Sequence, residues 1–293
     1  MKNSKIGGQA VIEGVMMRNG AKYAVAVRKP DDEIAVELFN IKSSRDKINK
    51  IPLVRGVVSF VDSLSIGMKS LTFSSSFFDE EEKTEKNEKK EKASNILVIA
   101  FSVLLALGIF MAIPYLVSQF IGKWIESNLI LSIIEGLIRL LFFFAYVILI
   151  SRLEDIRRVF AYHGAEHKCI NCIENGMELN VENVKKSSRF HKRCGTSFLF
   201  LVMIISMIFY CFINVDSRYL QFAIRLLLIP VIAGVSYEFL RLAGSVNGGI
   251  MDILSKPGLW LQHLTTNEPD EKMIEVGIKS VEAVFDWKSF IEG

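Results

Sequence analysis

One short string in the sequence places two histidines and a carboxylate at the spacing of a metal-binding helix. Residues 162–168 contain the motif HxxEH, in which His163 and His167 are four residues apart. On a helix these residues lie one turn above each other on the same face, so both imidazoles can reach one metal ion. Glu166 lies beside them and could bind the metal or take a proton from bound water, and inverted zinc peptidases use the same spacing. Taken alone, the motif equally fits two surface histidines on a polar helix.

The surroundings of this motif favour metal binding. Three of the four histidines and three of the four cysteines of the chain fall within the 32 residues 163–194. Core packing does not explain such clustering of the two residue types that bind zinc best. We therefore expect a divalent metal ion, zinc, as the cofactor of this segment.

Two sets of ligands are compatible with the spacing. The first has zinc-ribbon spacing and would form a closed structural site: Cys169, Cys172, His191 and Cys194. The second would be built on a helix and could hold a metal-bound water if one ligand stays away: His163, His167, His191 and Cys194, with Glu166 near. The cysteines at 169 and 172 also fit small buried hydrophobic residues.

Apolar segments occupy much of the remaining chain. Hydrophobic residues make up 51% of the sequence, and the mean hydropathy is +0.32. The 27 residues from Asn95 to Ile121 contain no charge and, at about 1.5 Å per residue, exceed the roughly 30 Å hydrocarbon core of a bilayer. Three further apolar segments follow, at 129–151, 197–215 and 219–240. We therefore expect an α-helical integral membrane protein with four transmembrane helices.

Ionisable residues interrupt two of these segments. Glu135 and Arg139 are four residues apart, in the order that favours an ion pair on one helix face. Arg225 and Glu238 lie on either side of Pro230 in the last segment. Such residues are functional candidates because their insertion into a bilayer is costly. For so few charges, however, we expect the pair to hold the helix bundle together and Arg225 and Glu238 to reach the membrane interfaces.

The charges of the connecting segments predict the orientation in the membrane. The segment between the second and third spans contains nine basic residues, whereas the two short connections contain one each, Lys123 and Arg218. Five lysines between residues 83 and 92 also precede the first span. Because Lys and Arg near span ends resist translocation, we expect both termini and the central loop to be cytoplasmic. In that reducing compartment the cysteines are not expected to form disulfides.

The water-facing segments predict a small α+β region built from the N-terminus, the central loop and the C-terminus. Residues 23–28 and 33–39 are β-rich and flank a Lys-Pro-Asp-Asp turn, which predicts a hairpin. Leu53–Phe73 has the periodicity of an amphipathic helix. Gly7-Gly8-Gln9 matches a tripeptide of peptide release factors, but glycines needed for a tight backbone path explain it better.

The C-terminal segment predicts a loop and then a helix. Residues 257–262 are expected to end a loop, and residues 265–270 to form a turn into the helix. The apolar stripe of this helix, which runs from Met273 to Phe285, is expected to pack against residues 1–50.

The predicted organisation along the chain has six parts. They are an N-terminal cytosolic hairpin with an amphipathic helix (1–78), a charged linker (79–94), two transmembrane helices (95–151), the metal-site loop (152–196), two more transmembrane helices (197–241) and a C-terminal cytosolic tail with an amphipathic helix (242–293). The net charge of +3 is too small to indicate a nucleic-acid partner. We expect membrane lipid and a membrane or cytosolic protein as partners; the sequence leaves the oligomeric state open.

Five regions of the chain, in order, resemble the bacterial YqhQ-like family of unknown function, whose members are described as membrane proteins and predicted metal-dependent enzymes. The strings are IGGQAVIEGVMMR at 6–18, PLVRG at 52–56, YHGAEHK at 162–168, RCGTSF at 193–198, and PGLWLQ at 257–262 with LTTNEPD at 264–270. The family pattern centres on HGAEHK and on the later His and Cys, which correspond here to His163, Glu166, His167, His191 and Cys194. It does not extend to the cysteines at 169 and 172, so the resemblance implies the helix-built site. It also implies the bacterial inner membrane as the location.

Three functions follow as hypotheses. The first is a zinc-dependent hydrolase that acts on a peptide, ester or amide at the membrane face, with Glu166 as the general base. The second is a non-catalytic membrane adaptor or assembly factor with a structural metal site. The third is a transporter, which would need charges that line a path through the helices.

Overall fold

The chain divides into two compact units. The computed structural model describes residues 2–41, 51–78, 97–125, 127–213, 215, 217–245 and 250–293. Unit 1 consists of residues 1–78, 148–201 and 233–293, and unit 2 of residues 79–147 and 202–232. The predicted charged linker, 79–94, lies outside the described residues.

Unit 1 contains a four-stranded antiparallel sheet in the order β1-β2-β3-β4. The strands are β1 (Gly7–Val11), β2 (Gly14–Asn19), β3 (Lys22–Arg28) and β4 (Ile34–Asn40). The predicted hairpin is confirmed as β3 and β4, in which Arg28 pairs with Ile34. Strands β1 and β2 were not predicted, and they extend this hairpin into a meander.

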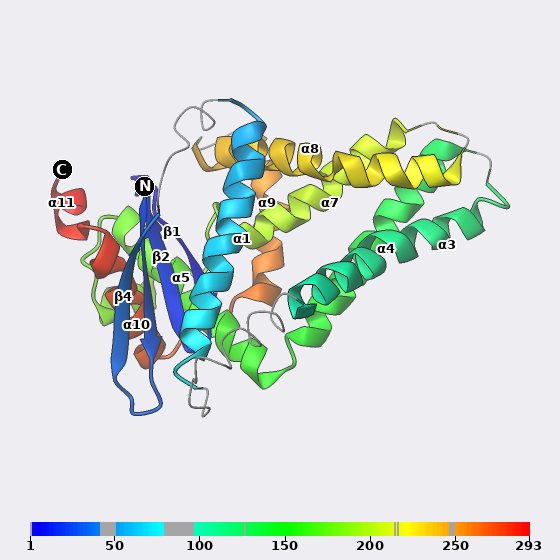
Figure 1. Ribbon diagram of the computed structural model, residues 1–293. Helices are drawn as coiled ribbons and strands as arrows, with labels where there is room; N and C mark the ends of the chain where they lie inside the picture. Colours follow the sequence, from blue (N-terminus) through cyan, green and yellow to red (C-terminus); the bar gives the residue numbers. More distant parts are fainter. Residues whose placement is uncertain are drawn as a thin grey trace. The chain divides into compact units, whose positions relative to one another are not determined.

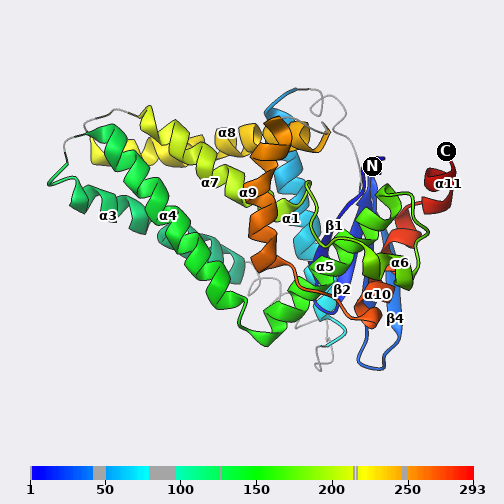
Figure 2. The same cartoon turned by 180° about the vertical axis from the view of Figure 1, so that it is seen from behind.

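Helices cover both faces of the sheet (Figures 1 and 2). Helices α5 (Glu154–Glu174) and α10 (Glu271–Val284) pack on one face, and α1 (Val54–Ser75) packs on the other. Successive strand residues point to opposite faces; Met17 belongs to the core with α5 and α10, whereas Met16 belongs to the core with α1. The expected packing of the C-terminal apolar stripe against residues 1–50 is therefore confirmed.

Helices α6, α9 and α11 also belong to unit 1. Helices α6 (Val181–Lys186) and α11 (Trp287–Glu292) are short, and α9 spans Ile250–Thr265. The expectation that residues 257–262 end a loop is wrong, because they lie within α9. Its last turn is fixed by the buried Gln262, whose side chain bonds both the backbone N–H and the carbonyl of His191 at 2.8 Å. The predicted turn into the last helix is confirmed, since Asp270 caps α10 by accepting from Met273 N.

Helix α1 also contacts the C-terminal half of α8 (Arg218–Ser245) closely. A Cβ added to Gly56 would lie 3.0 Å from the Cα of Gly234, so two glycines let the backbones approach. Arg55 donates to Glu238 on α8, with 2.6 Å between Nε and Oε1. Glu238, which was expected to reach a membrane interface, is thus paired with a residue of α1.

Among the residues that the structure describes, three helices are long and apolar enough to cross a membrane. They are Leu97–Ile121, which includes the π-helical turn η2 (Gly108–Ala112) and α3 (Ile113–Ile121), then α4 (Asn128–Ile150), and Tyr219–Leu242 within α8. The remaining predicted span corresponds to α7 (Gly195–Cys211), an apolar helix of only 17 residues. The described part of the chain is therefore mostly helical, with three candidate membrane-spanning helices and a small antiparallel sheet.

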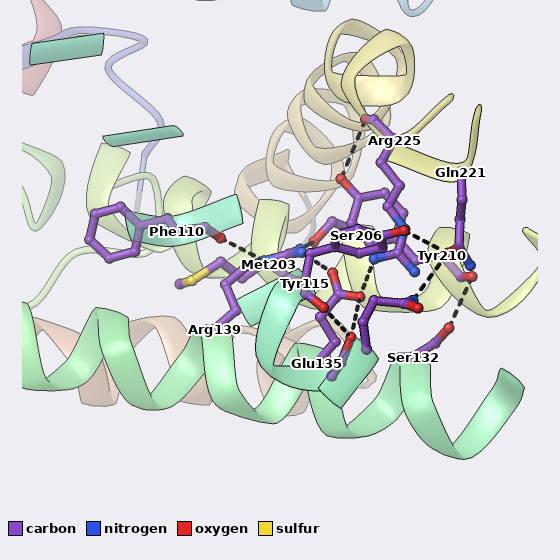
Figure 3. Close-up of polar contacts among 12 residues, drawn as sticks. Phe110, Tyr115, Ser132, Glu135, Arg139, Met203, Ser206, Tyr210, Gln221 and Arg225 are labelled. Carbon is purple, nitrogen blue, oxygen red and sulfur yellow. Dashed lines mark hydrogen bonds and ion pairs between the residues drawn. The ribbon is translucent and has the colours of Figure 1, made fainter. Parts of the chain in front are cut away.

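A buried ion-pair cluster joins the helices of unit 2 (Figure 3). The predicted pair is confirmed, since Arg139 Nη2 lies 2.8 Å from Glu135 Oε1. The expectation that Arg225 reaches an interface is wrong: its side chain is 3% exposed and pairs with the other carboxylate oxygen of Glu135. Because charge in an apolar environment is costly without a partner, the carboxylate of Glu135 draws both arginines inward.

Gly164 provides a test of how closely α5 packs. A Cβ at this position would lie 2.0 Å from the carbonyl oxygen of Asn267, whose own N–H donates to Phe160. We expect Gly164→Ala to destabilise unit 1 by about 1–3 kcal/mol, the usual cost of overpacking, even though alanine favours a helix. Thermal unfolding of the detergent-purified protein should show a lower melting temperature.

The matched control is Gly7→Ala, because an added Cβ there meets no heavy atom within 4 Å. We expect this variant to melt close to the wild type. Equal melting of the two variants would contradict the close approach.

Candidate metal centre

Helix α5 brings two of the predicted ligands to a third from a later segment. The ligand atoms of His163, His167 and Cys194 all lie within 4.8 Å of one another. His163 Nε2 is 3.2 Å from Cys194 Sγ, and the two imidazole rings are 4.4 Å apart between centroids. Two atoms bound to one zinc ion lie about 3.5 Å apart, given bonds of about 2.0–2.3 Å. The separations therefore suit a shared metal ion.

Backbone carbonyls orient both imidazoles toward Cys194. Nδ1 of His163 lies 2.8 Å from the carbonyl oxygen of Thr265, and Nδ1 of His167 lies 2.6 Å from that of Arg189. A carbonyl oxygen only accepts hydrogen bonds, so each Nδ1 carries the hydrogen. Both Nε2 atoms are then available as ligands, the arrangement common around histidines that bind metals.

His191 lies beside this group, but its ring nitrogen has a different partner. Its Nε2 is 3.4 Å from Glu174 Oε2, and Glu174 also accepts from Arg193 and from Ser4. Burial alone would raise the pKa of Glu174, but the hydrogen bonds from these three residues hold it at about 2. The structure thus places His191 next to His167, at 5.7 Å between ring centroids, without turning it toward the other three ligand atoms.

Glu166 is buried and lies near both imidazoles. Its Oε2 is 3.9 Å from the Nε2 atoms of His163 and of His167, which is too long for a hydrogen bond. Strand β1 contacts it from the other side, because a Cβ added to Gly8 would lie 2.8 Å from Glu166 Cγ. The same Cβ would lie 2.6 Å from the carbonyl oxygen of Met16, so the backbone of β2 and the side chain of Glu166 together leave room only for a glycine at position 8.

Two cysteines of the zinc-ribbon set, Cys169 and Cys172, are not gathered with Cys194 and the histidines. Cys169 and Cys172 are completely buried in the core that α5 forms with the sheet and α10. Burial raises the pKa of Cys169 well above its usual value and that of Cys172 to about 11. Both are therefore thiols that pack as small hydrophobic residues.

Cys194 has the opposite protonation preference. Burial opposes a thiolate there, but His163 and His167 outweigh it and hold the pKa of Cys194 well below its usual value. Burial likewise disfavours the charged form of His163, yet Cys194 and Glu166 raise its pKa to about 9. The pKa of His167 is raised by the same neighbours. A thiolate is the form in which cysteine binds metals.

A cavity of about 760 Å³ within unit 1 opens beside the three ligand residues. Its lining includes the predicted site residues, among them Glu166 and His191, and the backbone of Gly7 and Gly8. Other lining residues are apolar, basic or neutral polar; they include Ile6, Met16, Ile66, Phe160 and Leu199, then Lys5, Arg18 and Arg193, and Gln9, Ser63 and Thr196. The arrangement therefore places the ligand atoms and a carboxylate where a small molecule can reach them.

Sequence reasoning missed the residues that hold this site in place. Glu174, Gln262 and the carbonyls of Thr265 and Arg189 contact the predicted residues from other segments. Carbonyl groups belong to every residue type, so no pattern marks those two. Only the strings around 162–168 and 257–270 point to the segments involved.

Comparisons with known proteins agree with the resemblance in the sequence. The family model described as "Protein of unknown function (DUF1385)" matches residues 51–287. The chain is 36% identical over 288 residues to "Uncharacterized protein YqhQ" of Bacillus subtilis (strain 168), an alignment that covers 94% of this chain and 90% of that protein. No solved structure matches the chain significantly. The chain belongs to the DUF1385 family of proteins of unknown function.

Proposed function

We propose that this protein is a membrane-bound, zinc-dependent hydrolase whose ligands are His163, His167 and Cys194. The observation that carries the proposal is the placement of these three ligand residues and of Glu166 on the wall of one cavity. Catalytic zinc sites keep three protein ligands and an open position, whereas structural sites use four protein ligands. Two imidazole nitrogens and a thiolate are a donor set that zinc prefers.

When bound, zinc would lower the pKa of a water molecule and polarise the substrate carbonyl. Glu166 would hold and accept the proton at its carboxylate, which lies within 4 Å of both histidine Nε2 atoms. Thr265 and Arg189 would keep the imidazoles in the tautomer that leaves Nε2 free. The apolar and basic residues among the lining suit a peptide, ester or amide substrate with apolar groups and an anionic group.

The adaptor hypothesis depends on a fourth ligand. Turning His191 toward the other three residues would break its contact with Glu174 and would close the site. A closed site would stabilise the loop but would leave no position for a metal-bound water. The hydrolase proposal therefore requires that His191 does not become a fourth ligand. We therefore rank the adaptor second.

We also propose that α7 spans the membrane, with both termini and the central loop cytoplasmic at the bacterial inner membrane. The support comes from the number of membrane crossings between segments of one core. The sheet precedes the first span, α5 lies between α4 and α7, and α10 follows α8. All three share one core and must lie on the same side of the membrane. An even number of spans must separate them, so α7 must cross if α8 crosses. Its 17 residues are at the lower limit for a span, about 17–25 residues.

Metal content tests the ligand set. We expect the detergent-purified protein to contain about one zinc ion per chain, measured by inductively coupled plasma mass spectrometry. His163→Ala, His167→Ala and Cys194→Ser should each lose it, because two ligands bind zinc far more weakly than three. His191→Gln should keep it, since Glu174 and not the metal site holds that ring.

The matched control is His263→Ala, a histidine that stacks on Phe190 outside the site. It should keep its zinc. Loss of zinc from a normally folded His191→Gln variant would favour the closed site of the adaptor. Absence of zinc from the wild type would rule out both the zinc hydrolase and the adaptor with a structural metal.

Hydrolysis tests the role of Glu166. The probes are p-nitrophenyl esters of increasing acyl length and quenched fluorescent peptides with and without acidic residues. Glu166→Gln should retain zinc and lose at least about a hundredfold in rate, the usual contribution of a general base. Glu178→Gln is the control, because Glu178 is exposed on the segment after α5. Unchanged activity in Glu166→Gln would rule out the proposed base.

Reporter fusions test the number of spans. With four spans, green fluorescent protein fused after Gly293 lies in the cytoplasm and fluoresces, and alkaline phosphatase at the same point is inactive. With three spans the two results would be reversed, because the C-terminus would lie on the other side.

A further inference from the structure

The ion-pair cluster of unit 2 carries more positive than negative charge. Glu135 is paired with both Arg139 and Arg225, and the three side chains are almost completely buried. Lys123 lies beside them on the wall of the same cavity as Glu135 and Arg225. One carboxylate thus pairs with two arginines in helices that are apolar enough to cross a membrane. Lys123, an exposed residue just after α3, adds a third cation to the cavity wall.

Arg225 is held by its surroundings but retains a donor. The guanidinium lies between the rings of Tyr115 and Tyr210, 4.9 and 4.8 Å from their centroids, and one amino group donates to Glu135. Its Nε is buried and has no hydrogen-bond partner in the part of the chain that the structure describes. Buried donors are normally satisfied, so this N–H is a candidate for an acceptor from a ligand.

The cavity beside Arg225 has the size and lining of a small polar site. Its volume is about 280 Å³, against about 30 Å³ for one water molecule in the liquid. Besides the charged residues, hydroxyl and amide groups line it: Ser118, Gln119, Asn128, Ser132 and Gln221. The aliphatic lining is limited to Ile125, Leu131 and Val215.

We propose that this cavity binds a phosphate group, held by Arg225 and Lys123 and by the side-chain amides around them; the hydroxyls of Ser118 and Ser132 already donate to the carbonyls of Tyr115 and Tyr210. Arginine and lysine together with neutral donors are the groups that bind the several oxygens of a phosphate. The bound anion would compensate the positive charge that Glu135 leaves unbalanced. The phosphate belongs either to a phospholipid head group or to free inorganic phosphate. This site is separate from the metal centre and does not depend on the proposed hydrolase.

Binding to the full chain tests the proposal. The protein is kept in dodecyl maltoside, a detergent without phosphate, and two probes are added: radiolabelled inorganic phosphate, and soluble dihexanoyl phosphatidylglycerol followed by native mass spectrometry. We expect saturable binding of at least one probe. Binding of inorganic phosphate identifies a free ion, and binding of the lipid alone identifies a head group.

Variants distinguish a ligand site from a purely structural cluster. Lys123→Gln should weaken binding at least about tenfold, the effect of losing one charge-assisted hydrogen bond, while the exposed Lys279→Gln on α10 should not change it. Glu135→Gln should strengthen binding, because it removes the carboxylate that competes with the anion. If Glu135→Gln does not fold, Lys123→Gln still tests the site. Lys123 is exposed, so its replacement should leave the fold intact.

Three results would overturn the proposal. They are the absence of saturable binding of both probes, equal binding by Lys123→Gln and the wild type, and displacement of the probe by chloride at the same concentration.

Discussion

The packing of α5 against the sheet and α10 is the interaction on which the rest of unit 1 depends. Residues 161–174 of this helix are buried almost without interruption, although its sequence is not strongly apolar. Three separate segments of the chain supply the cover, and Gly277 of α10 approaches so closely that an added Cβ would lie 2.9 Å from Cys169 Sγ. Because α5 is fixed in this core, the directions of His163 and His167 are fixed as well, and Glu166 is held between them and strand β1.

The same packing explains why the site is held by backbone groups. Gly164 allows the segment after α9 to cross α5 at Asn267, whose N–H donates to the carbonyl of Phe160. This crossing brings the carbonyl of Thr265 to His163. On the other side, Lys168 donates to the carbonyls of Lys185 and Ser187 and so holds the segment that leads to Arg189 and Cys194. A buried lysine thus acts as a support for a neighbouring ligand segment.

Much of this arrangement was predictable from local patterns. Helical spacing placed His163, Glu166 and His167 on one helix, and clustering of His and Cys brought Cys194 to them. Patterns within one segment do not report partners in another, so the pairing of His191 with Glu174 was not predicted.

The fold was predicted in part. The hairpin of β3 and β4 was predicted from its turn. Strands β1 and β2 were missed because their sequences lack the alternation of a half-exposed strand, and the structure buries β2 on both faces. Charge patterns within spans predicted the pair of Glu135 with Arg139 but not its sharing with Arg225, which comes from a helix 90 residues later.

The construction of unit 1 from three separate segments has a consequence for the timing of folding. Contacts between residues so far apart in the sequence can form only after the intervening chain has been made, and long-range pairing is intrinsically slow. The carbonyl that orients His163 belongs to residue 265, and the helix that completes the core ends at residue 284. The HxxEH helix can therefore pack on the sheet as soon as it is made, but it lacks α10 until two further apolar helices have been synthesised. The last of the three ligand residues is Cys194, but the carbonyl that orients His163 comes 71 residues later, so a chain that ends before α9 would have the ligands without this contact.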